Sequence, residues 1–181
     1  MRLDEDELKP LVDAWREANP AIVKCWNAME HAAIKTMAEK KTVTVQHGIQ
    51  FSVKSGIFFI KLPCGRKLAY AKPRLEKDKK FNKVGLTYEG IHEGKWTRLR
   101  TYGGKLVENI VQAIARDALA EALMRMKDVD LVMHVHDEIV ADAPDNLTLK
   151  EMDELMGQSI DWAPGLPLTA DGFETDFYRK D

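Results

Sequence analysis

The sequence predicts an α+β fold in which helices pack on an antiparallel sheet. Three patterns indicate this class: helical periodicity in the first forty residues, a run of short alternating segments from about residue 42 to residue 101, and a long helical pattern followed by a tight hairpin. The chain has 181 residues, 45% of them hydrophobic and 31% charged. These values are typical of one domain, or of one lobe of a larger protein.

Two helices are expected at the start of the chain. Apolar residues recur at helical spacing between Leu8 and Trp15, and Asn19-Pro20 interrupts the pattern. Pro20 suits the first position of the second helix, which should extend to about Glu39. Its apolar stripe comprises Ile22, Val23, Trp26, Met29, Ala33 and Met37. Because so little chain joins the two helices, we expect them to pack as an antiparallel pair.

The middle of the chain favours short strands separated by glycines. Lys72–Lys83 has the composition of a mobile loop, and the segments on either side of Gly90–Gly94 resemble a hairpin. The expected strands are Thr42–Val45, Phe51–Val53, Ile57–Leu62, Leu68–Ala71, Val84–Tyr88 and Lys95–Thr101.

The last third of the chain begins with its strongest helical pattern, about Lys105–Met126. The face predicted to be buried carries Val107, Ile110, Val111, Ile114, Ala118, Ala122 and Met126. Two strands should follow, Val129–Val135 and Glu138–Ala141, with only His136-Asp137 between them. A helix from about Thr148 to Ile160 and an extended strap from Pro164 to Asp181 complete the prediction.

Composition excludes several classes of protein. The longest apolar runs fall far short of the ~20 residues that a membrane span needs. Met1-Arg2-Leu3 is followed at once by four acidic residues, which is unlike a signal peptide. Two cysteines, Cys25 and Cys64, are too few for a disulfide framework or a Cys-rich zinc site. We therefore expect a cytoplasmic, reduced protein without membrane contact, and we exclude collagen, coiled-coil and disordered classes.

Charge is unevenly distributed along the sequence. Residues 1–60 carry 8 basic and 8 acidic side chains, residues 61–105 carry 13 and 4, and residues 106–181 carry 6 and 17. This polarity indicates a polyanion near the basic segment and a metal near the acidic one. The alternative interpretation of the basic segment is a solvated lysine-rich loop.

The pattern most indicative of chemistry is His136-Asp137-Glu138, between two apolar strands. Burying these groups without partners would be costly, whereas at a hairpin tip they can project into a cleft. Two adjacent carboxylates suit Mg²⁺, which prefers oxygen ligands and keeps waters or phosphates as further ligands. An ordinary polar turn remains the alternative.

The preceding helix carries a polar stripe opposite its apolar one. Its members are spaced three or four residues apart and include hydrogen-bond donors and acceptors. Such a stripe suits base edges or a DNA minor groove, and it would suit solvent equally well. It comprises Lys105, Glu108, Asn109, Gln112 and Arg116.

Two long segments, Thr101–Asp117 and His134–Val140, resemble the C-terminal part of a family A, polymerase-I-like DNA polymerase of the phage and prophage type. The resemblance continues through Gly165–Leu168 and Ala170–Glu174. Upstream, Leu62–Leu68 is similar to the Gly-Arg-Arg hairpin of this family, with a lysine where a second arginine is common. The resemblance to this family therefore covers nearly the whole chain, and it implies that the chain folds into a palm-like core.

The resemblance also implies roles for the hairpin turn. Asp137 would be the metal-binding aspartate of the third catalytic motif, and Glu138 its secondary carboxylate. His136 would lie near the 3′ end of the primer. The implied cofactor is Mg²⁺, and the implied partners are a DNA template-primer and deoxynucleoside triphosphates.

Further residues are expected to contact DNA. Gln112 occupies the position of a glutamine that contacts the minor groove near the nascent base pair, and Glu108 and Asn109 depart from the broader family but look normal for its phage branch. We expect Arg98 and Arg100 to face phosphates as well. Besides these two arginines, the candidate DNA-binding residues are Gln112, Lys105, Asn109, Arg116, Arg66 and Lys67.

Two family motifs are missing from the sequence: the first carboxylate motif and the fingers helix that grips the incoming nucleotide. Nucleotidyl transfer uses two metals ~3.5–4 Å apart, which this family holds with aspartates of the first and third motifs. We therefore expect a C-terminal fragment that holds half of the site and is inactive alone. A variant of this expectation is a split polymerase, which the missing N-terminal part completes in trans. The segments of the fragment would be 1–60 (end of the fingers region), 61–105 (basic hairpin region) and 106–181 (palm portion).

Two other functions remain open at this stage. The chain could be a truncated prophage product that folds and at most binds DNA without catalysis. It could also be a metallohydrolase, because His134-Val135-His136-Asp137 has the His-x-His-Asp pattern of sites that bind transition metals. That site requires the strand to continue through His136, since residues two apart share a face only in a strand.

Overall fold

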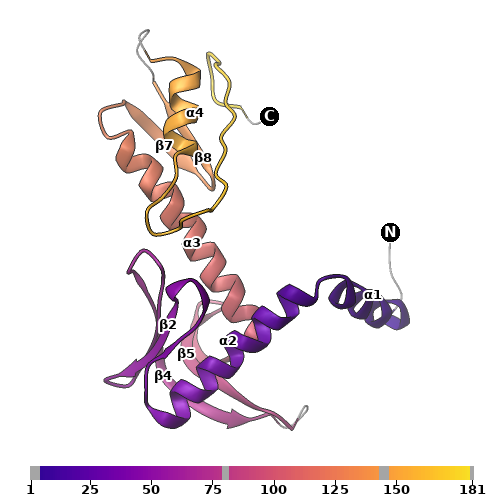
Figure 1. Ribbon diagram of the computed structural model, residues 1–181. Coiled ribbons are helices and arrows are strands. Elements are labelled where there is room, and N and C mark those ends of the chain that lie inside the picture. The colour runs from indigo at the N-terminus through magenta and orange to yellow at the C-terminus, as the bar shows by residue number, and fades with distance from the viewer. Residues whose placement is uncertain (1–4, 79–81, 143–146, 180–181) are drawn as a thin grey trace. The chain divides into compact units, whose positions relative to one another are not determined.

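The computed structural model describes residues 5–78, 82–142 and 147–179. It confirms the predicted α+β class, with four α-helices and a six-stranded antiparallel sheet among the described residues (Figure 1). The elements are α1 (Glu5–Ala18), α2 (Pro20–Glu39), β1 (Val43–Thr44), η1 (Gln46–Gly48), β2 (Gln50–Lys54), β3 (Ile57–Lys61), β4 (Lys67–Lys77), β5 (Val84–His92), β6 (Lys95–Arg100), α3 (Gly103–Arg125), β7 (Leu131–Val135), β8 (Glu138–Ala141) and α4 (Leu149–Gly157).

The chain forms two compact units, Met1–Val111 and Gln112–Asp181, and α3 contributes residues to both. Within the first unit the six strands are arranged in sequence order, each antiparallel to its neighbours. None of the helices in the described ranges is long and apolar enough to cross a membrane.

One face of the sheet carries the core of the first unit. Strand residues alternate between the two faces, so the register places Phe51, Phe58 and Tyr70 on the same side. Their rings form a continuous chain with centroids 5.8 and 5.9 Å apart, and Tyr88 adds an edge-on ring 4.8 Å from that of Tyr70. The side chains of Phe51, Phe58 and Tyr70 are all buried. This face is therefore the one on which the helices pack.

Helix α2 covers that face (Figure 1). Proline begins the helix at position 20, as predicted, and Lys40 ends it in the left-handed conformation, with its N–H donating to the carbonyl of Thr36. Its buried residues recur at three- and four-residue intervals, which is the spacing of one helical face. They are Met29, Ala32, Ala33, Thr36 and Met37.

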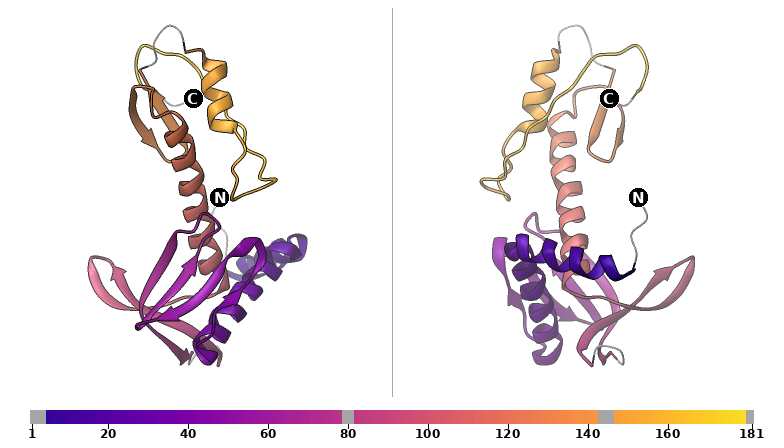
Figure 2. Two further views of the ribbon diagram at one scale, coloured as in Figure 1. Left: turned by 60° about the vertical axis from the view of Figure 1, so that its left-hand side comes forward. Right: turned by 90° about the vertical axis from the view of Figure 1, so that its right-hand side faces the viewer.

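The predicted antiparallel packing of the first two helices is wrong. Only Asn19 separates α1 from α2, and Figures 1 and 2 show α1 leaving α2 at a bend instead of folding back along it. A helical hairpin needs a loop of at least two residues, which is more than this junction has. The two helices do touch at one stacked pair, Trp15 and Trp26, with ring centroids 5.6 Å apart.

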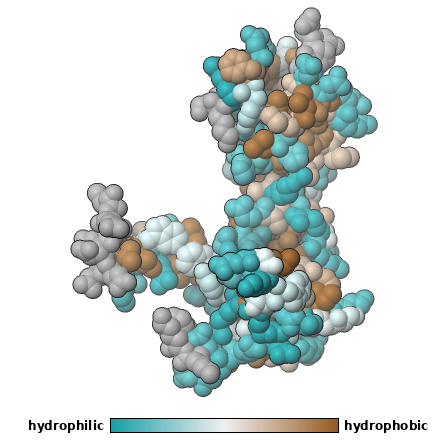
Figure 3. Space-filling view, turned by 180° about the vertical axis from the view of Figure 1, so that it is seen from behind, coloured by the Kyte–Doolittle hydropathy of each residue, from teal (hydrophilic) through white to brown (hydrophobic). Residues whose placement is uncertain are grey.

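As a consequence, the apolar stripe of α1 is exposed. Figure 3 shows brown, apolar atoms on the surface of α1, which projects to the left in that view. The opposite side of the helix carries the ion pair between Lys9 and Asp13, so α1 is amphipathic. Exposed fractions of 45% to 51% are found for Leu8, Leu11, Val12 and Trp15.

The prediction that Lys72–Lys83 forms a loop is also wrong for the first half of this segment. Residues Lys72–Lys77 belong to β4, which pairs with β5. The register shifts between Ala71 and Arg74, where two residues of β4 oppose one of β5, as in a β-bulge. Lys72 has a φ of 46° at this bulge. Residues 79–81 of the predicted loop lie outside the described part of the chain.

Helix α3 starts where its backbone touches α2. A Cβ placed on Gly103 would lie 2.1 Å from the carbonyl oxygen of Trp26, far inside the contact distance of two atoms. At the neighbouring Gly104, the nearest atom to such a Cβ is in the side chain of Tyr102, 3.1 Å away. Only a residue without a side chain therefore allows α2 and α3 to approach this closely at position 103.

The buried face of α3 differs in part from the predicted one. Ile110, Ala122 and Met126 are buried as expected, whereas Val111 is 56% exposed. Three residues outside the prediction are buried instead: Leu106, Ala113 and Leu119.

The second unit is held together by side chains that satisfy helix ends. Thr148 and Glu151 form a reciprocal capping box at the start of α4. At the other end of α4, the guanidinium of Arg125 donates to the carbonyl oxygens of Leu155, Gln158 and Ser159, at 3.2, 2.9 and 2.9 Å. Helix α4 ends at Gly157, short of the predicted Ile160. The predicted strap has neither helix nor strand over its described residues 164–179, and just before it the indole of Trp162 donates to Glu121.

Candidate functional site

The His-Asp-Glu cluster lies at the tip of the β7–β8 hairpin. His136 and Asp137 make the two-residue connection, as predicted, and His136 has a φ of 52°. Histidine tolerates this left-handed conformation better than a β-branched residue would. Asp137 is exposed, and Glu138, the first residue of β8, is half-buried. The carboxylate at position 137 is therefore accessible, which the predicted site requires.

Glu138 has a partner that sequence reasoning missed. The hydroxyl of Tyr178, in the strap, donates to Glu138 Oε2 at 2.9 Å. The hydrogen bond to this carboxylate raises the pKa of Tyr178, and burial raises it further. Tyr178 therefore holds one oxygen of Glu138 in place. No local pattern links two residues that are 40 positions apart, so the sequence offers no signal for this contact.

The donor set at the hairpin fits one side of a magnesium site. Asp137 and Glu138 supply oxygen ligands, the type that Mg²⁺ prefers. Across residues 5–78, 82–142 and 147–179, no group of three or more His, Cys, Asp or Glu side chains could hold a metal ion. These two residues would therefore need further ligands from elsewhere.

The geometry does not favour the metallohydrolase alternative. His134 lies within β7, but the strand ends at Val135 and His136 adopts a left-handed turn conformation. The alternation that would place both imidazoles on one face is therefore broken between them.

The predicted polar stripe of α3 divides between the two units. In the first unit, Lys105 pairs with Glu108 at 2.9 Å, and the hydrogen bond to that carboxylate raises the pKa of Lys105. Asn109 donates to the hydroxyl of Tyr70 at 3.0 Å. Its amide therefore anchors α3 to the sheet, a structural role that the sequence did not predict. In the second unit, Gln112 and Arg116 are exposed on α3.

Arg66 and Lys67 are exposed at the β3–β4 connection. The Leu62 N–H donates to the Arg66 carbonyl at 2.8 Å, and Gly65 supplies the positive φ, 95°, that the turn requires. The ammonium of Lys67 lies 5.8 Å from the ring centroid of Phe59. Both side chains are therefore placed at the surface by a defined tight turn.

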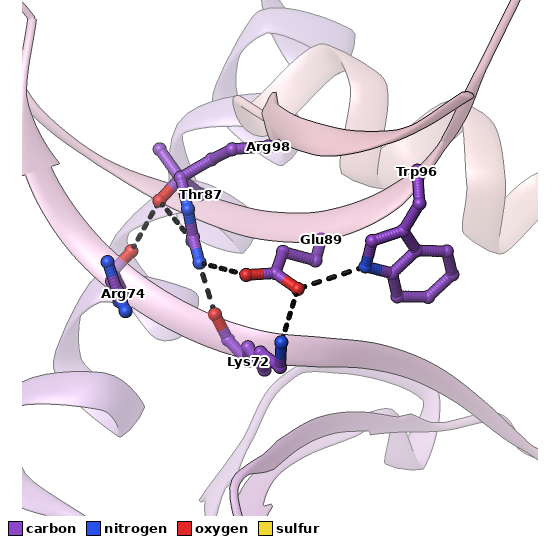
Figure 4. Close-up of polar contacts among 6 residues, drawn as sticks. All are labelled: Lys72, Arg74, Thr87, Glu89, Trp96 and Arg98. Atoms are coloured by element: carbon purple, nitrogen blue, oxygen red, sulfur yellow. Dashed lines mark hydrogen bonds and ion pairs between the residues drawn. The ribbon is translucent and has the colours of Figure 1, made fainter.

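Arg98 and Arg100 do not have the free phosphate-facing role that we expected. Arg98 binds Glu89 at 3.1 Å and also donates to Thr87 and to the carbonyl of Lys72 (Figure 4). Arg100 pairs with Asp78 at 3.2 Å and donates to two backbone carbonyls. Both guanidinium groups therefore hold β4, β5 and β6 together.

Glu89 is the centre of this network. Besides Arg98, it accepts from Lys72 Nζ at 2.7 Å and from the indole N–H of Trp96 at 2.9 Å. The hydrogen bonds from Lys72 and Trp96, with the charges of Lys72 and Arg98, lower the pKa of Glu89 from 4.5 to about 2. The carboxylate is therefore ionised at any pH at which the chain is studied under ordinary conditions.

This shift predicts a pH dependence of stability. A carboxyl whose pKa is lower in the folded chain stabilises the fold above its unfolded pKa, and the stabilisation is lost as the pH falls through the folded pKa. We expect Glu89→Gln to lower the melting temperature at pH 7. The difference from the native chain should shrink between about pH 4.5 and pH 2. Thermal denaturation across this range measures it, and a constant difference would contradict the assignment.

Comparison with known proteins gives one match. Along its whole length the chain is 58% identical, over 185 aligned residues, to a protein of Bacillus phage SP02 described as a DNA polymerase. The match covers 28% of that protein, so the chain spans little more than a quarter of the length of the curated relative. No family model matches the chain. No solved structure matches it either.

Proposed function

We propose that this chain is the C-terminal, palm-containing fragment of a family A DNA polymerase. In this proposal it binds a DNA template-primer and contributes one half of the metal site for nucleotidyl transfer. The observation that carries the proposal is the similarity to a phage DNA polymerase over the whole chain, at 58% identity. The exposed carboxylate at the tip of a rigid hairpin supports the assignment of the site.

The proposed roles within the site are those that the resemblance to the polymerase family implies, and the exposed hairpin tip supports them. Asp137 would bind the metal directly from the tip, and Glu138 would lie beside it with one oxygen already engaged by Tyr178. Magnesium bound there would supply charge stabilisation at the reacting oxygens. His136, in its left-handed conformation, would support the primer end. Gln112 and Arg116 would contact the nascent duplex, and Arg66 and Lys67 its phosphates.

The remainder of the polymerase is the proposed partner of this chain. An exposed apolar helical face is unusual in a monomer and typical of an interaction surface, and α1 exposes such a face. The relative is more than three times as long as the segment that matches. We therefore assign the α1 face as the surface that the rest of the polymerase covers.

Primer extension tests the proposal. The chain is purified and mixed with a labelled primer-template, Mg²⁺ and all four deoxynucleoside triphosphates. We expect no extension by the chain alone, and extension when the part of the Bacillus phage SP02 polymerase that lies outside the match is added. Robust extension without that addition would contradict the half-site proposal. A complex of the two parts that binds DNA and extends nothing would contradict the polymerase assignment.

A further inference from the structure

The sheet of the first unit has a second face, opposite the one covered by α2. The register of β2 to β6 assigns alternate residues to it, because paired residues on neighbouring strands share a face. We call it the open face. It comprises Gln50, Ser52, Lys54, Ile57, Phe59, Lys61, Lys67, Ala69, Ala71, Arg74, Glu76, Thr87, Glu89, Ile91, Trp96, Arg98 and Arg100, and the Lys72 side chain reaches it through the ion pair with Glu89.

The open face is strongly basic. Its carboxylates are Glu76 and Glu89, and the ion pair with Arg100 brings Asp78 to it as well. Glu89 is already neutralised by Lys72 and Arg98. Its basic side chains are Lys54, Lys61, Lys67, Lys72, Arg74, Arg98 and Arg100. Seven basic groups against three acidic ones on one side of a sheet make a surface that attracts a polyanion.

Trp96 is an exposed aromatic side chain in a fixed position on this face. It is 61% exposed, and its indole N–H donates to Glu89 at 2.9 Å (Figure 4). Glu89 is itself held by Lys72 and Arg98. The polar edge of the indole is therefore satisfied and the ring is oriented, while its apolar surface is left to solvent. A ring fixed before binding loses little conformational entropy when a ligand stacks on it.

We propose that the open face binds single-stranded nucleic acid, with an unpaired base stacked on Trp96 and the backbone phosphates near the exposed lysines. Base–aromatic stacking beside a positively charged groove is the usual basis of such binding, and it tolerates any sequence. The inference builds on the proposed function, because a template is unpaired before it is copied. The inference adds a ligand, single-stranded nucleic acid, and a residue, Trp96, that the proposed metal half-site does not include.

Charge decides between nucleic acid and a protein as the occupant. An exposed tryptophan next to an arginine is also common in protein interfaces, but protein interfaces are depleted of lysine in their centre. Here Lys54 and Lys67 are exposed on the same face as Trp96. Phosphates are the natural partners of such exposed cations.

Fluorescence anisotropy with labelled oligonucleotides tests the inference. The full chain is titrated with an oligothymidylate and with a blunt duplex, at one fixed salt concentration. Trp96→Ala should weaken binding of the single strand by roughly 5- to 100-fold, the loss expected for one base–aromatic stack. Binding of the duplex should change by less than about twofold, since stacking needs an unpaired base.

Two further variants separate stacking from general disturbance. Val84→Ala is the control, because Val84 lies on β5, on the other face of the sheet, and is 47% exposed but has no aromatic ring. It should leave single-strand binding unchanged. Trp96→Phe keeps a ring without the N–H and should restore part of the affinity. In addition, the tryptophan fluorescence that is lost in Trp96→Phe should be quenched by the oligonucleotide in the native chain.

The outcomes distinguish this inference from the proposed function. Equal losses in Trp96→Ala and Val84→Ala, or equal losses for single strand and duplex, would overturn it, as would a native chain that does not bind the single strand. In each of these cases primer extension with the added polymerase segment could still succeed. Conversely, a Trp96-dependent single-strand affinity, together with an assembled complex of the two parts that binds DNA and extends nothing, would uphold the open face and reject the polymerase assignment.

Discussion

Replacing Asp137 by alanine is expected to abolish primer extension by the reconstituted polymerase. The aspartate is the exposed carboxylate at the hairpin tip, and its proposed role is to hold metal at the reacting oxygens. Metal stabilisation of that charge is worth several kcal/mol, and each 1.36 kcal/mol changes the rate tenfold. We therefore expect the extension rate to fall by about three orders of magnitude. Rapid-quench extension assays measure this rate.

The variant should fold normally, because Asp137 is exposed and located in a turn. Asp142→Ala, at an exposed aspartate just after β8, is the matched control and should keep full activity. Glu138→Ala should cost less than Asp137→Ala, and His136→Ala should mainly raise the primer concentration needed for half-maximal rate. If Asp137→Ala and Asp142→Ala had the same activity, the hairpin would not be the metal site.

Replacing Gly103 by alanine is expected to destabilise the first unit by about 3 kcal/mol or more, beyond the usual cost of overpacking. The added Cβ would lie 2.1 Å from the carbonyl oxygen of Trp26. A backbone atom cannot rotate away, so α2 or α3 must shift as a whole. Chemical denaturation followed by circular dichroism measures the change, since the midpoint falls when stability is lost.

Gly104→Ala provides the control one residue further along the same helix. There the nearest atom belongs to the side chain of Tyr102, which is exposed and can rotate. Alanine is also the better helix former, by up to about 1 kcal/mol. This variant should therefore be neutral or slightly more stable. Similar losses in the two variants would mean that the close approach of α2 and α3 at position 103 does not occur.

Local patterns predicted the elements whose stability is local. The hairpin β7–β8 was expected because two apolar strands are separated by only two polar residues, and its turn lies at His136-Asp137 as predicted. The start of α2 at Pro20 also follows from a local rule, since proline lacks the N–H that the first helical turn does not use. These features required no knowledge of distant residues.

Features that depend on distant partners were missed. The lysine-rich composition of Lys72–Lys77 suggested a loop, but a strand with one open face can carry charge on that face. The spacing of the apolar residues in α1 correctly predicted that they share one face of a helix. The spacing does not indicate which other part of a protein covers that face. Likewise, the register of β5 and β6 decides that Arg98 meets Glu89, and the path of the strap decides that Tyr178 meets Glu138.

The order of the six strands bears on how the protein folds during its synthesis. Each strand pairs with the one before it in the sequence, so every ladder of the sheet closes between Val43 and Arg100. Sheets built from such local pairings avoid long loop closures, which slow the folding of other β-proteins. The strands can therefore join one after another as the chain leaves the ribosome. The basic open face would then exist before the ribosome has translated Tyr178, the residue that holds Glu138.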